Sequence, residues 1–532
     1  MPQTALIKLD PSIANDDLSI RLAIAKKLGV TENLITGFVI TKRSIDARGK
    51  QPMIQIQADA FINEKIGADG SYKLRLKKVS AFSKKILIVG AGPAGLFAAL
   101  SLLEQGHHPM IIERGKDVKE RRRDLAQLNK KGIVNPDSNY CFGEGGAGTY
   151  SDGKLYTRSS KRGDVKKVLH MFVEFGASHD ILYDAHPHIG TNKLPQIIMN
   201  MRNAIIQHGG EIHFNTRLTD IIIDNDHIQE IQTENGLSFK ADAYLLATGH
   251  SARDIFYLLQ KKNILIEAKP LAIGVRIEHP QALINNIQYG SSASLVDDPS
   301  DLSYLPPASY SLVQQVQGRG VFSFCMCPGG IVAAAATEPG EVVVNGWSPS
   351  KRNNPFANSG LVVEIRKEDV LAELPELDEN DPLLFLKYQQ HIEQGCFRAA
   401  GSDLSAPAQR MKDFADGKKS LDLPKTSYTP GVTTVNLKEV LPSVIYDTLA
   451  AALVLFGKKL KGFFNNDAVV IATESRTSSP IKIPRNAINF QHAEIENLYP
   501  CGEGAGYAGG IVSAAMDGQA VATAISLKLE AN

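Results

Sequence analysis

KILIVGAGPAGLFAALSLLEQGHHPMIIERG, residues 85–115, is the stretch that decides the fold. Residues 86–89 form a continuous apolar run, which is typical of a strand buried on both faces of a parallel sheet. Gly90, Gly92 and Gly95 follow in G-x-G-x-x-G spacing, and leucines and alanines then recur at helical intervals. The pattern predicts a strand, a tight glycine turn, a helix and a second strand.

Each part of this stretch has a use in binding a dinucleotide. Gly90 permits the sharp turn, Gly92 lets backbone N–H groups approach a pyrophosphate, and Gly95 lets the helix pack closely on the strand. The second strand ends at Glu113, about 20 residues beyond the glycines, where a carboxylate accepts from ribose hydroxyls and repels a 2′-phosphate. These residues predict a dinucleotide site and leave FAD and NAD as alternatives.

Composition excludes several other classes of protein. The 532 residues are 43% hydrophobic, which is enough for two or three domains, and the net charge of +1 indicates neither nucleic acid nor anionic membrane as a partner. The N-terminus lacks signal-peptide features and no apolar stretch is long enough to span a membrane, so we expect a soluble, cytoplasmic protein. Five cysteines, an odd number, fit a reducing compartment.

A glycine-rich loop over residues 138–155 is the second candidate for cofactor contact. Five glycines in eleven residues are costly to order, and aromatic residues flank them, which favours a backbone that runs along a flat ligand. The charged helix before it is mostly a solvated face, but Arg121, Arg122 and Arg123 lie where a guanidinium could reach a phosphate or an adenine edge.

The end of the chain decides which cofactor is expected. LYPCGEGAGYAGGI, residues 498–511, runs from a strand through glycines into a helix. The Gly-acid pair resembles the one that contacts the ribityl and phosphate in FAD enzymes with two dinucleotide folds. The helix N-terminus suits the flavin C2 carbonyl, where negative charge gathers on reduction. A protein that binds only NAD has no use for a further motif of this kind, so we expect FAD.

Six motifs resemble those of a known family: SNYCFGEGGAGTYSDGKL, ATGHSARD, AIGVRIEHP, FCMCPGG, ESRTSSP and LYPCGEGAGYAGGI. They are similar to motifs of the uncharacterised bacterial FAD-dependent dehydrogenases, often labelled NAD(FAD)-utilising dehydrogenases, of the glutathione-reductase-like flavoprotein superfamily. The resemblance covers nearly the whole chain from Lys85, and the first 80 residues resemble the small N-terminal domain of that family. Glu503 departs from the wider superfamily, in which Asp is commoner.

We therefore expect an α/β protein of four segments. Residues 1–80 form a small N-terminal α+β domain, 81–268 the first part of a Rossmann-like FAD-binding domain with a β-meander, 269–467 an inserted α+β substrate domain, and 468–532 the C-terminal part of the FAD-binding domain. In the first segment we expect a helix over 16–28 with Leu18 and Leu22 on its buried face, and a turn-like loop over 42–48.

The residues expected at FAD come from all of these motifs. They are Gly90, Gly92, Pro93, Ala94, Gly95, Glu113, Arg114, Arg122, Gly145, Gly146, Ala147, Gly148, Thr149, Lys154, Leu218, Ala247, Thr248, Gly249, Gly502, Glu503, Gly509, Gly510 and Ile511. No metal is expected, because the pair His186 and His188 has no cysteine or carboxylate at useful spacing.

The predicted function is two-electron (hydride) transfer through non-covalent FAD on a small-molecule substrate. Arg476 is the candidate for anchoring the substrate, with a structural ion pair as the alternative, and His250, Ser478 and Ser479 are lesser candidates. One G-x-G-x-x-G precedes a strand and an acid, so NAD(P)H is expected to bind only transiently, with NADH and NADPH differing little. The rival class is a non-catalytic or RNA-modifying flavoprotein whose N-terminal domain binds a macromolecule, which the near-neutral charge disfavours.

Cys325 and Cys327 lie at alternate positions of a predicted strand. Regular alternation places both cysteines on one face, opposite Phe322, Phe324 and Met326, so the bulky face is expected in the core. The pair is either two small residues that make room or a redox-active dithiol. Positions i and i+2 of a strand are about 6.6 Å apart, near the upper limit for a disulfide, so we expect two free thiols.

Overall fold

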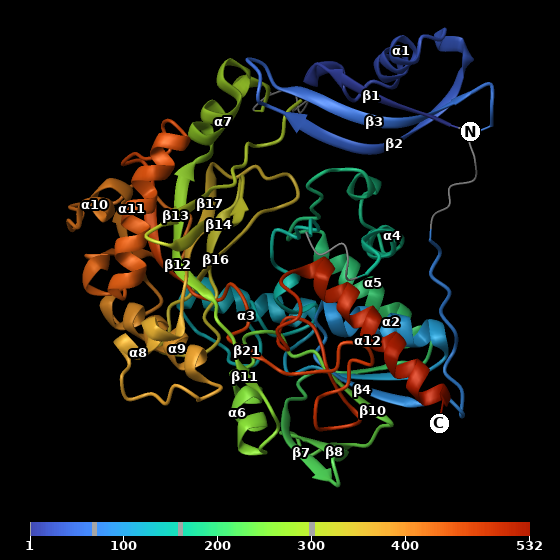
Figure 1. The fold of residues 1–532 in the computed structure, drawn as a ribbon, viewed down its shortest axis with the longest axis vertical. Coiled ribbons are helices and arrows are strands. Elements are labelled where there is room, and N and C mark those ends of the chain that lie inside the picture. The colour runs from blue at the N-terminus through green and yellow to red at the C-terminus, as the bar shows by residue number, and fades with distance from the viewer. Residues whose placement is uncertain (1, 66–71, 158–162, 297–303, 532) are drawn as a thin grey trace.

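The computed structural model describes residues 2–65, 72–157, 163–296 and 304–531. Three sheets carry most of the fold (Figure 1). A three-stranded sheet near the N-terminus lies at the top of the view, a seven-stranded sheet lies at the left, and a five-stranded sheet lies at the lower right.

The five-stranded sheet is built from both ends of the chain. Its order is β22 (Leu498–Pro500), β10 (Ala243–Leu246), β4 (Lys85–Val89), β5 (His108–Ile112) and β6 (Glu211–His213). Every pairing is parallel, so the carboxyl ends of all five strands meet at one edge. The predicted strand, helix and strand over residues 85–112 are confirmed, with α2 (Pro93–Gln105) between β4 and β5.

Both faces of this sheet are covered, as the apolar run of β4 predicts. Ile86 and Ile88 point into a core shared with α2, α4 (Val165–Glu174), α5 (Leu194–Gln207) and α12 (Ile511–Ala531). Leu87 and Val89 point into a second core, formed with the meander β7 (Leu218–Asp224) and β8 (His227–Thr233) and with α6 (Arg253–Lys261). The strand β9 (Ser238–Phe239) completes the meander.

The N-terminal sheet corrects two expectations. It pairs β1 (Gln3–Leu9), β3 (Met53–Ile62) and β2 (Ile35–Asp46), so residues 42–46 continue a strand and are not the turn-like loop that was expected. The helix α1 (Asp17–Leu28) buries Ile20 and Ile24 and leaves Leu18 and Leu22 about half exposed. Apolar residues on both sides of this helix made the choice of buried face ambiguous.

The seven-stranded sheet holds most of the inserted segment. Its order is β13 (Val313–Val316), β14 (Arg319–Cys327), β17 (Phe356–Glu364), β12 (Ala272–Pro280), β20 (Val469–Glu474), β18 (Ala406–Arg410) and β19 (Val432–Thr434). The surrounding helices are α7 (Gln281–Tyr289), α8 (Lys367–Glu373), α9 (Leu384–Ala399), α10 (Met411–Asp416) and α11 (Ser443–Lys459). Two short pairs, β15 (Ile331–Ala334) with β16 (Val344–Trp347) and β11 (Glu267–Ala268) with β21 (Ile481–Lys482), and the helix α3 (Val118–Lys131) complete the regular elements that position the site.

Strand β20 corrects the expected start of the C-terminal FAD-binding segment at residue 468. It pairs with β12 and β18, so it belongs to the seven-stranded sheet. All six of its residues are buried. A strand that is buried on both faces has the same apolar sequence pattern in either sheet, so the pattern did not show which sheet it joins. The chain re-enters the five-stranded sheet only at β22.

No helix within the described ranges combines the length and hydropathy that crossing a bilayer requires.

Candidate functional site

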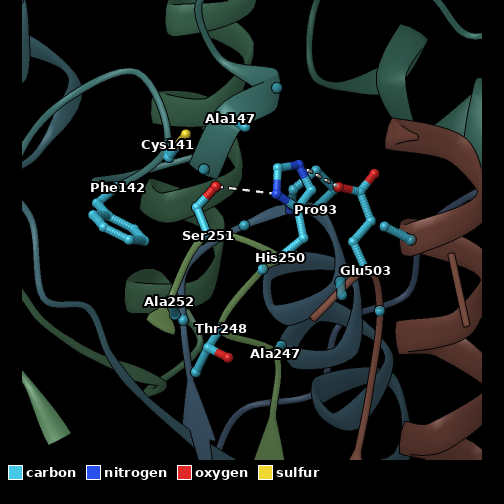
Figure 2. A pocket seen from close by; sticks show the side chains of 18 of the residues that line it. Pro93, Cys141, Phe142, Ala147, Ala247, Thr248, His250, Ser251, Ala252 and Glu503 are labelled. Atoms are coloured by element: carbon cyan, nitrogen blue, oxygen red, sulfur yellow. Dashed lines mark hydrogen bonds and ion pairs between the residues drawn. The ribbon is translucent and has the colours of Figure 1, made fainter. Parts of the chain in front are cut away.

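A cavity of about 330 Å³ opens at the carboxyl edge of the five-stranded sheet. Crevices at this edge are where open α/β sheets bind their ligands. Figure 2 shows part of its wall, with His250 between Ser251 and Glu503. The residues predicted at FAD that line it are Gly90, Gly92, Pro93, Ala94, Glu113, Arg114, Gly146, Ala147, Gly148, Lys154, Leu218, Ala247, Thr248, Gly249, Gly502, Glu503, Gly509, Gly510 and Ile511.

The glycines of the first motif are required by close backbone approach. Gly90 has φ of +109°, and a Cβ there would lie 2.4 Å from the carbonyl oxygen of Ala247, at the end of β10. A Cβ on Gly95 would lie 2.0 Å from the carbonyl oxygen of Gly90, although Gly95 itself does not line the cavity. Gly92 precedes α2, whose first-turn N–H groups have no partner within the helix. The cradle is shaped for an anionic group such as pyrophosphate.

Glu113 holds three backbone segments together at the nucleotide end of the cavity. Its Oε2 accepts from the N–H of Ala91 at 2.9 Å, and its Oε1 accepts from those of Gly115 at 2.9 Å and Gly143 at 3.0 Å. Each carboxylate oxygen accepts about two hydrogen bonds, so Oε2 keeps one acceptor position. That position fits the ribose hydroxyl expected from the sequence.

Arg121 was considered for contact with a phosphate or an adenine edge, but its guanidinium binds backbone carbonyls of the protein instead. It is fully buried, and its guanidinium donates to the carbonyls of Asn139, Tyr140, Glu144 and Gly146 at 2.8 to 2.9 Å. The glycine-rich loop is thus wrapped around an arginine from α3.

Three of the other residues predicted at FAD lie outside the cavity. Arg122 is exposed on α3 and does not line it, so the structure does not support a contact between Arg122 and the cofactor. Gly145 and Thr149 lie behind the cavity wall, where Gly145 N–H donates to Ala91 O at 2.8 Å and Thr149 Oγ1 donates to Glu144 O at 2.7 Å. These two residues hold the loop in place.

His250 and Glu503 lie next to each other in the wall. Ser251 Oγ lies 3.0 Å from His250 Nδ1, and His250 Nε2 lies 3.7 Å from Glu503 Oε2 (Figure 2). Burial, with the nearby charge of Arg476, lowers the pKa of His250 to about 4. Burial also raises the pKa of Glu503. Both shifts favour the neutral forms.

Arg476 lines the cavity but is committed to a buried cluster of charges. Its guanidinium lies 3.1 Å from Glu341 and 3.0 Å from Glu393, and it also donates to Thr337 Oγ1 at 2.6 Å. Arg253 reaches the same two carboxylates at 2.6 Å. The geometry favours the structural ion pair, the alternative that the sequence left open, over a substrate anchor.

The two serine candidates do not reach the cavity. Ser479 Oγ donates to Gly504 O at 3.2 Å, and Ser478 is half-buried away from the cavity wall. The structure thus gives neither serine a place beside a ligand.

A bulge in β14 overturns the expected faces of the Cys325 and Cys327 strand. The register shifts between Phe324 and Cys327, and Cys325 has φ of +44°, so the alternation breaks. Phe324 and Cys325 line the cavity, whereas Cys327 is buried. Both thiols are free, as expected.

Sequence reasoning missed the contribution of the inserted segment to the wall. Phe324, Asn345 and Gly346 line the cavity from β14 and β16. Asp152 and Ser151 line it from the glycine-rich loop, beside Lys154. Asn345 lies in β16, directly after the apolar residues 342–344, and carries no signal in the sequence. Asp152 stands in the quoted loop and could have been singled out as a charge among glycines.

Comparison with known protein families agrees with this geometry. Residues 83–236 match a family described as FAD binding domain, and residues 270–477 match one described as FAD-dependent protein, C-terminal domain-like. Residues 1–61 match a domain of unknown function. The chain is an FAD-binding flavoprotein of mixed α/β fold.

An uncharacterized protein of Clostridium beijerinckii is 39% identical over 538 aligned residues, which cover 97% of each chain. The chain belongs to the same family as this protein.

Solved flavoprotein structures show a more distant likeness. CtdE in complex with FAD is 11% identical, with a TM-score of 0.34, over 84% of this chain and 85% of that chain. Glycine oxidase from Bacillus cereus is 12% identical, with a TM-score of 0.30, over 84% of this chain and 96% of that chain. At such low identity the likeness says nothing about the substrate of this chain.

Proposed function

We propose that the protein is an FAD-dependent oxidoreductase that exchanges two electrons with a small molecule, a dehydrogenase of the NAD(FAD)-utilising type. The observation that carries this proposal is the composition of the cavity wall. One part comes from the nucleotide motifs of the five-stranded sheet, and another comes from Phe324, Cys325 and Asn345 of the inserted segment. A ligand held by the nucleotide motifs would therefore share the cavity with a second molecule.

The residues that line the cavity fit the groups of FAD. Glu113 offers an acceptor to the ribose, and the start of α2 offers N–H donors to the pyrophosphate. Gly146 to Gly148 and Gly509 to Ile511 line the region beyond them without bulky side chains, apart from Ile511. FAD supplies the two-electron chemistry, while these residues bind and orient it.

His250 and Glu503 are placed to handle a proton beside the ligand. The neutral imidazole of His250 can accept a proton at a ring nitrogen, and burial raises the pKa of the Glu503 carboxyl, which favours the form that can donate a proton. Both side chains line the cavity, so the proton that accompanies electron transfer need not come from bulk water. A nicotinamide, if it is the reductant, would enter the same cavity transiently, because a single G-x-G-x-x-G of the sequence is followed by a strand and an acid, and FAD is expected to occupy that motif.

The cofactor tests this proposal directly. Purified protein should be yellow, should release FAD and not FMN on denaturation, and should lose its visible absorption under anaerobic reduction. Glu113→Lys should bind FAD more weakly, since a hydrogen bond to a charged group contributes on the order of 1.5–3 kcal/mol. A colourless protein that cannot be reconstituted with FAD would rule the proposal out.

A further inference from the structure

The part of the cavity next to the inserted segment differs from the nucleotide end in its chemistry. Phe324 and Cys325 of β14 and Asn345 of β16 form this part together with Lys154 of the glycine-rich loop. Lys154 reaches the inserted segment directly, because its Nζ lies 3.4 Å from Cys327 Sγ. Lys154 therefore lies between the two sheets.

Lys154 is a cation that keeps one N–H group of its ammonium available to a ligand. Its Nζ lies 3.3 Å from Asp152 Oδ2, and its side chain remains 34% exposed. An ammonium carries three N–H groups, and Asp152 and Cys327 engage two of them. Although burial opposes the charge, Cys327 and Asp152 raise the pKa of Lys154, so it stays protonated at neutral pH.

The negative charge of Asp152 is shared with a second cation. Arg352 lies 2.9 Å from Asp152 Oδ2, and Ser348 Oγ donates to Oδ1 of the same carboxylate. Lys154 and Arg352 together carry two positive charges against one negative charge. The cluster of these three residues thus has one uncompensated positive charge.

The neighbouring charged groups do not cancel the net positive charge of Lys154, Arg352 and Asp152. Arg276 and Glu474 pair at 2.7 Å, and the two arginines near Glu341 and Glu393 are held by those carboxylates. Glu503 favours its neutral form, since burial raises its pKa. The ionised carboxylate nearest to Lys154 is Asp152, and Arg352 shares its charge, so an anion that binds here would meet a cluster with a net positive charge.

Asn345 supplies a second donor in the same part. Its Oδ1 accepts the N–H of Gly346 at 2.7 Å, which fixes the amide so that its Nδ2 is the group left to bond elsewhere. No partner for Nδ2 is found among the residues that the structure describes, and Asn345 lines the cavity. Phe324 provides apolar surface in this part, and the half-exposed ring of Tyr156 also lines the cavity.

We infer that this part of the cavity binds a small organic carboxylate, with its oxygens accepting from Lys154 Nζ and Asn345 Nδ2 and its apolar body against Phe324. The inference rests on the proposed function and names the substrate class of the same site. It assigns the anchoring cation to Lys154 and not to Arg476, because Arg476 is already committed to Glu341 and Glu393.

Benzoate and benzamide are the probes that test this inference in the FAD-loaded protein. They have the same shape and differ in charge, and binding beside the flavin perturbs its visible absorption. Benzoate should give a saturable shift with a dissociation constant at least about tenfold lower than that of benzamide. Equal affinity for the two, or no shift with benzoate, overturns the inference.

Three variants assign the effect to the donors. Lys154→Gln and Asn345→Asp should each raise the dissociation constant for benzoate at least about tenfold, with FAD still bound. Lys116→Gln is the matched control, because Lys116 pairs with Asp124 at 3.0 Å, is 32% exposed and does not line the cavity. Its benzoate affinity should stay unchanged.

The results that would contradict the carboxylate site differ from those that would contradict the proposed function. Wild-type protein without FAD contradicts the proposed function, whereas FAD-loaded protein with unchanged benzoate affinity in Lys154→Gln contradicts only the carboxylate site. Loss of FAD from Lys154→Gln would assign Lys154 to the cofactor and also overturn the inference.

Discussion

Arg121 is the residue on which the glycine-rich loop depends. We expect Arg121→Met to lose about 3 kcal/mol or more in the free energy of unfolding and to bind FAD more weakly, since two buried and two partly buried carbonyls lose their donor. Urea unfolding and FAD titration measure the two effects. Arg123→Met, two positions along the same helix and exposed, should stay within about 0.5 kcal/mol of wild type.

Three neighbouring arginines of α3 show what the sequence alone cannot predict about single residues. Arg121, Arg122 and Arg123 are chemically identical, and only the direction of α3 relative to the loop decides which of them is buried. Glu113 could be placed in advance, because its role follows from its distance from the glycines. Asn345 could not, because its position in the cavity depends on how β16 packs against a distant segment.

His279 makes the stability of the protein depend on pH. It is fully buried, with Nε2 2.9 Å from Phe463 O, and burial lowers its pKa from 6.5 to about 4, although the bond to Phe463 and the charge of Asp467 oppose the shift. Between about pH 4 and 6.5, His279 is protonated in the unfolded chain but neutral in the folded chain. The free energy of unfolding therefore falls as the pH drops through this window. One group of this kind contributes up to about 3 kcal/mol.

His279→Gln keeps a donor for Phe463 and removes the titration. Its unfolding free energy should therefore decrease less than that of wild type between pH 6.5 and 4, as urea denaturation at each pH would measure. Parallel pH profiles for the two proteins would contradict the assignment.

At the scale of elements, the contact between α12 and α2 leaves no room for a side chain. A Cβ on Gly518 would lie 2.1 Å from the carbonyl oxygen of Ala94, in the first turn of α2. We expect Gly518→Ala to lower the unfolding temperature and to release FAD more readily, because α2 must shift. Gly395→Ala in α9 is the control, since its Cβ would meet only Arg398 at 4.0 Å, and it should be neutral or stabilising by up to about 1 kcal/mol.

Elements with a self-contained pattern were predicted correctly, and those fixed by tertiary pairing were not. The stretch from β4 to β5 carries its own turn, helix and strand signals, and the structure confirms it. Strand β17, with Asn358, Ser359 and Gly360 at its centre, has poor strand propensity and was not predicted, although it pairs with both β12 and β14. The bulge at Cys325 breaks a period of two that the sequence displays without interruption.

At the scale of the whole molecule, a buried cluster joins the nucleotide part to the inserted part. Arg253 of α6 and Arg476, which follows β20, meet Glu341 and Glu393 of α9, and all four side chains are at most 3% exposed. Ser475 Oγ adds a bond of 2.5 Å to Glu393. Burial alone would favour the neutral carboxyl, but the two arginines hold the pKa of Glu393 below its usual value.

Glu393→Gln should destabilise the protein by about 3 kcal/mol or more, because it leaves two buried arginines with one carboxylate. Urea unfolding should show this loss, and limited proteolysis should cut faster between the two parts. Glu379→Gln, which removes a 63% exposed partner of Lys367, should change the unfolding free energy by at most about 0.5 kcal/mol. Equal effects of the two substitutions would mean that the cluster does not join the parts.

The late position of β22 in the sequence sets when the cofactor can first be bound. The sheet edge that carries the cavity is completed by β22 and by the start of α12, while β4 and the first glycine motif appear early in the chain. Synthesis proceeds from the N-terminus, so a nascent chain displays its glycine motif on the ribosome long before Leu498 emerges. The complete cavity can therefore form only after β22 and the start of α12 have emerged, and until then the apolar face of α2 lacks the cover that α12 provides.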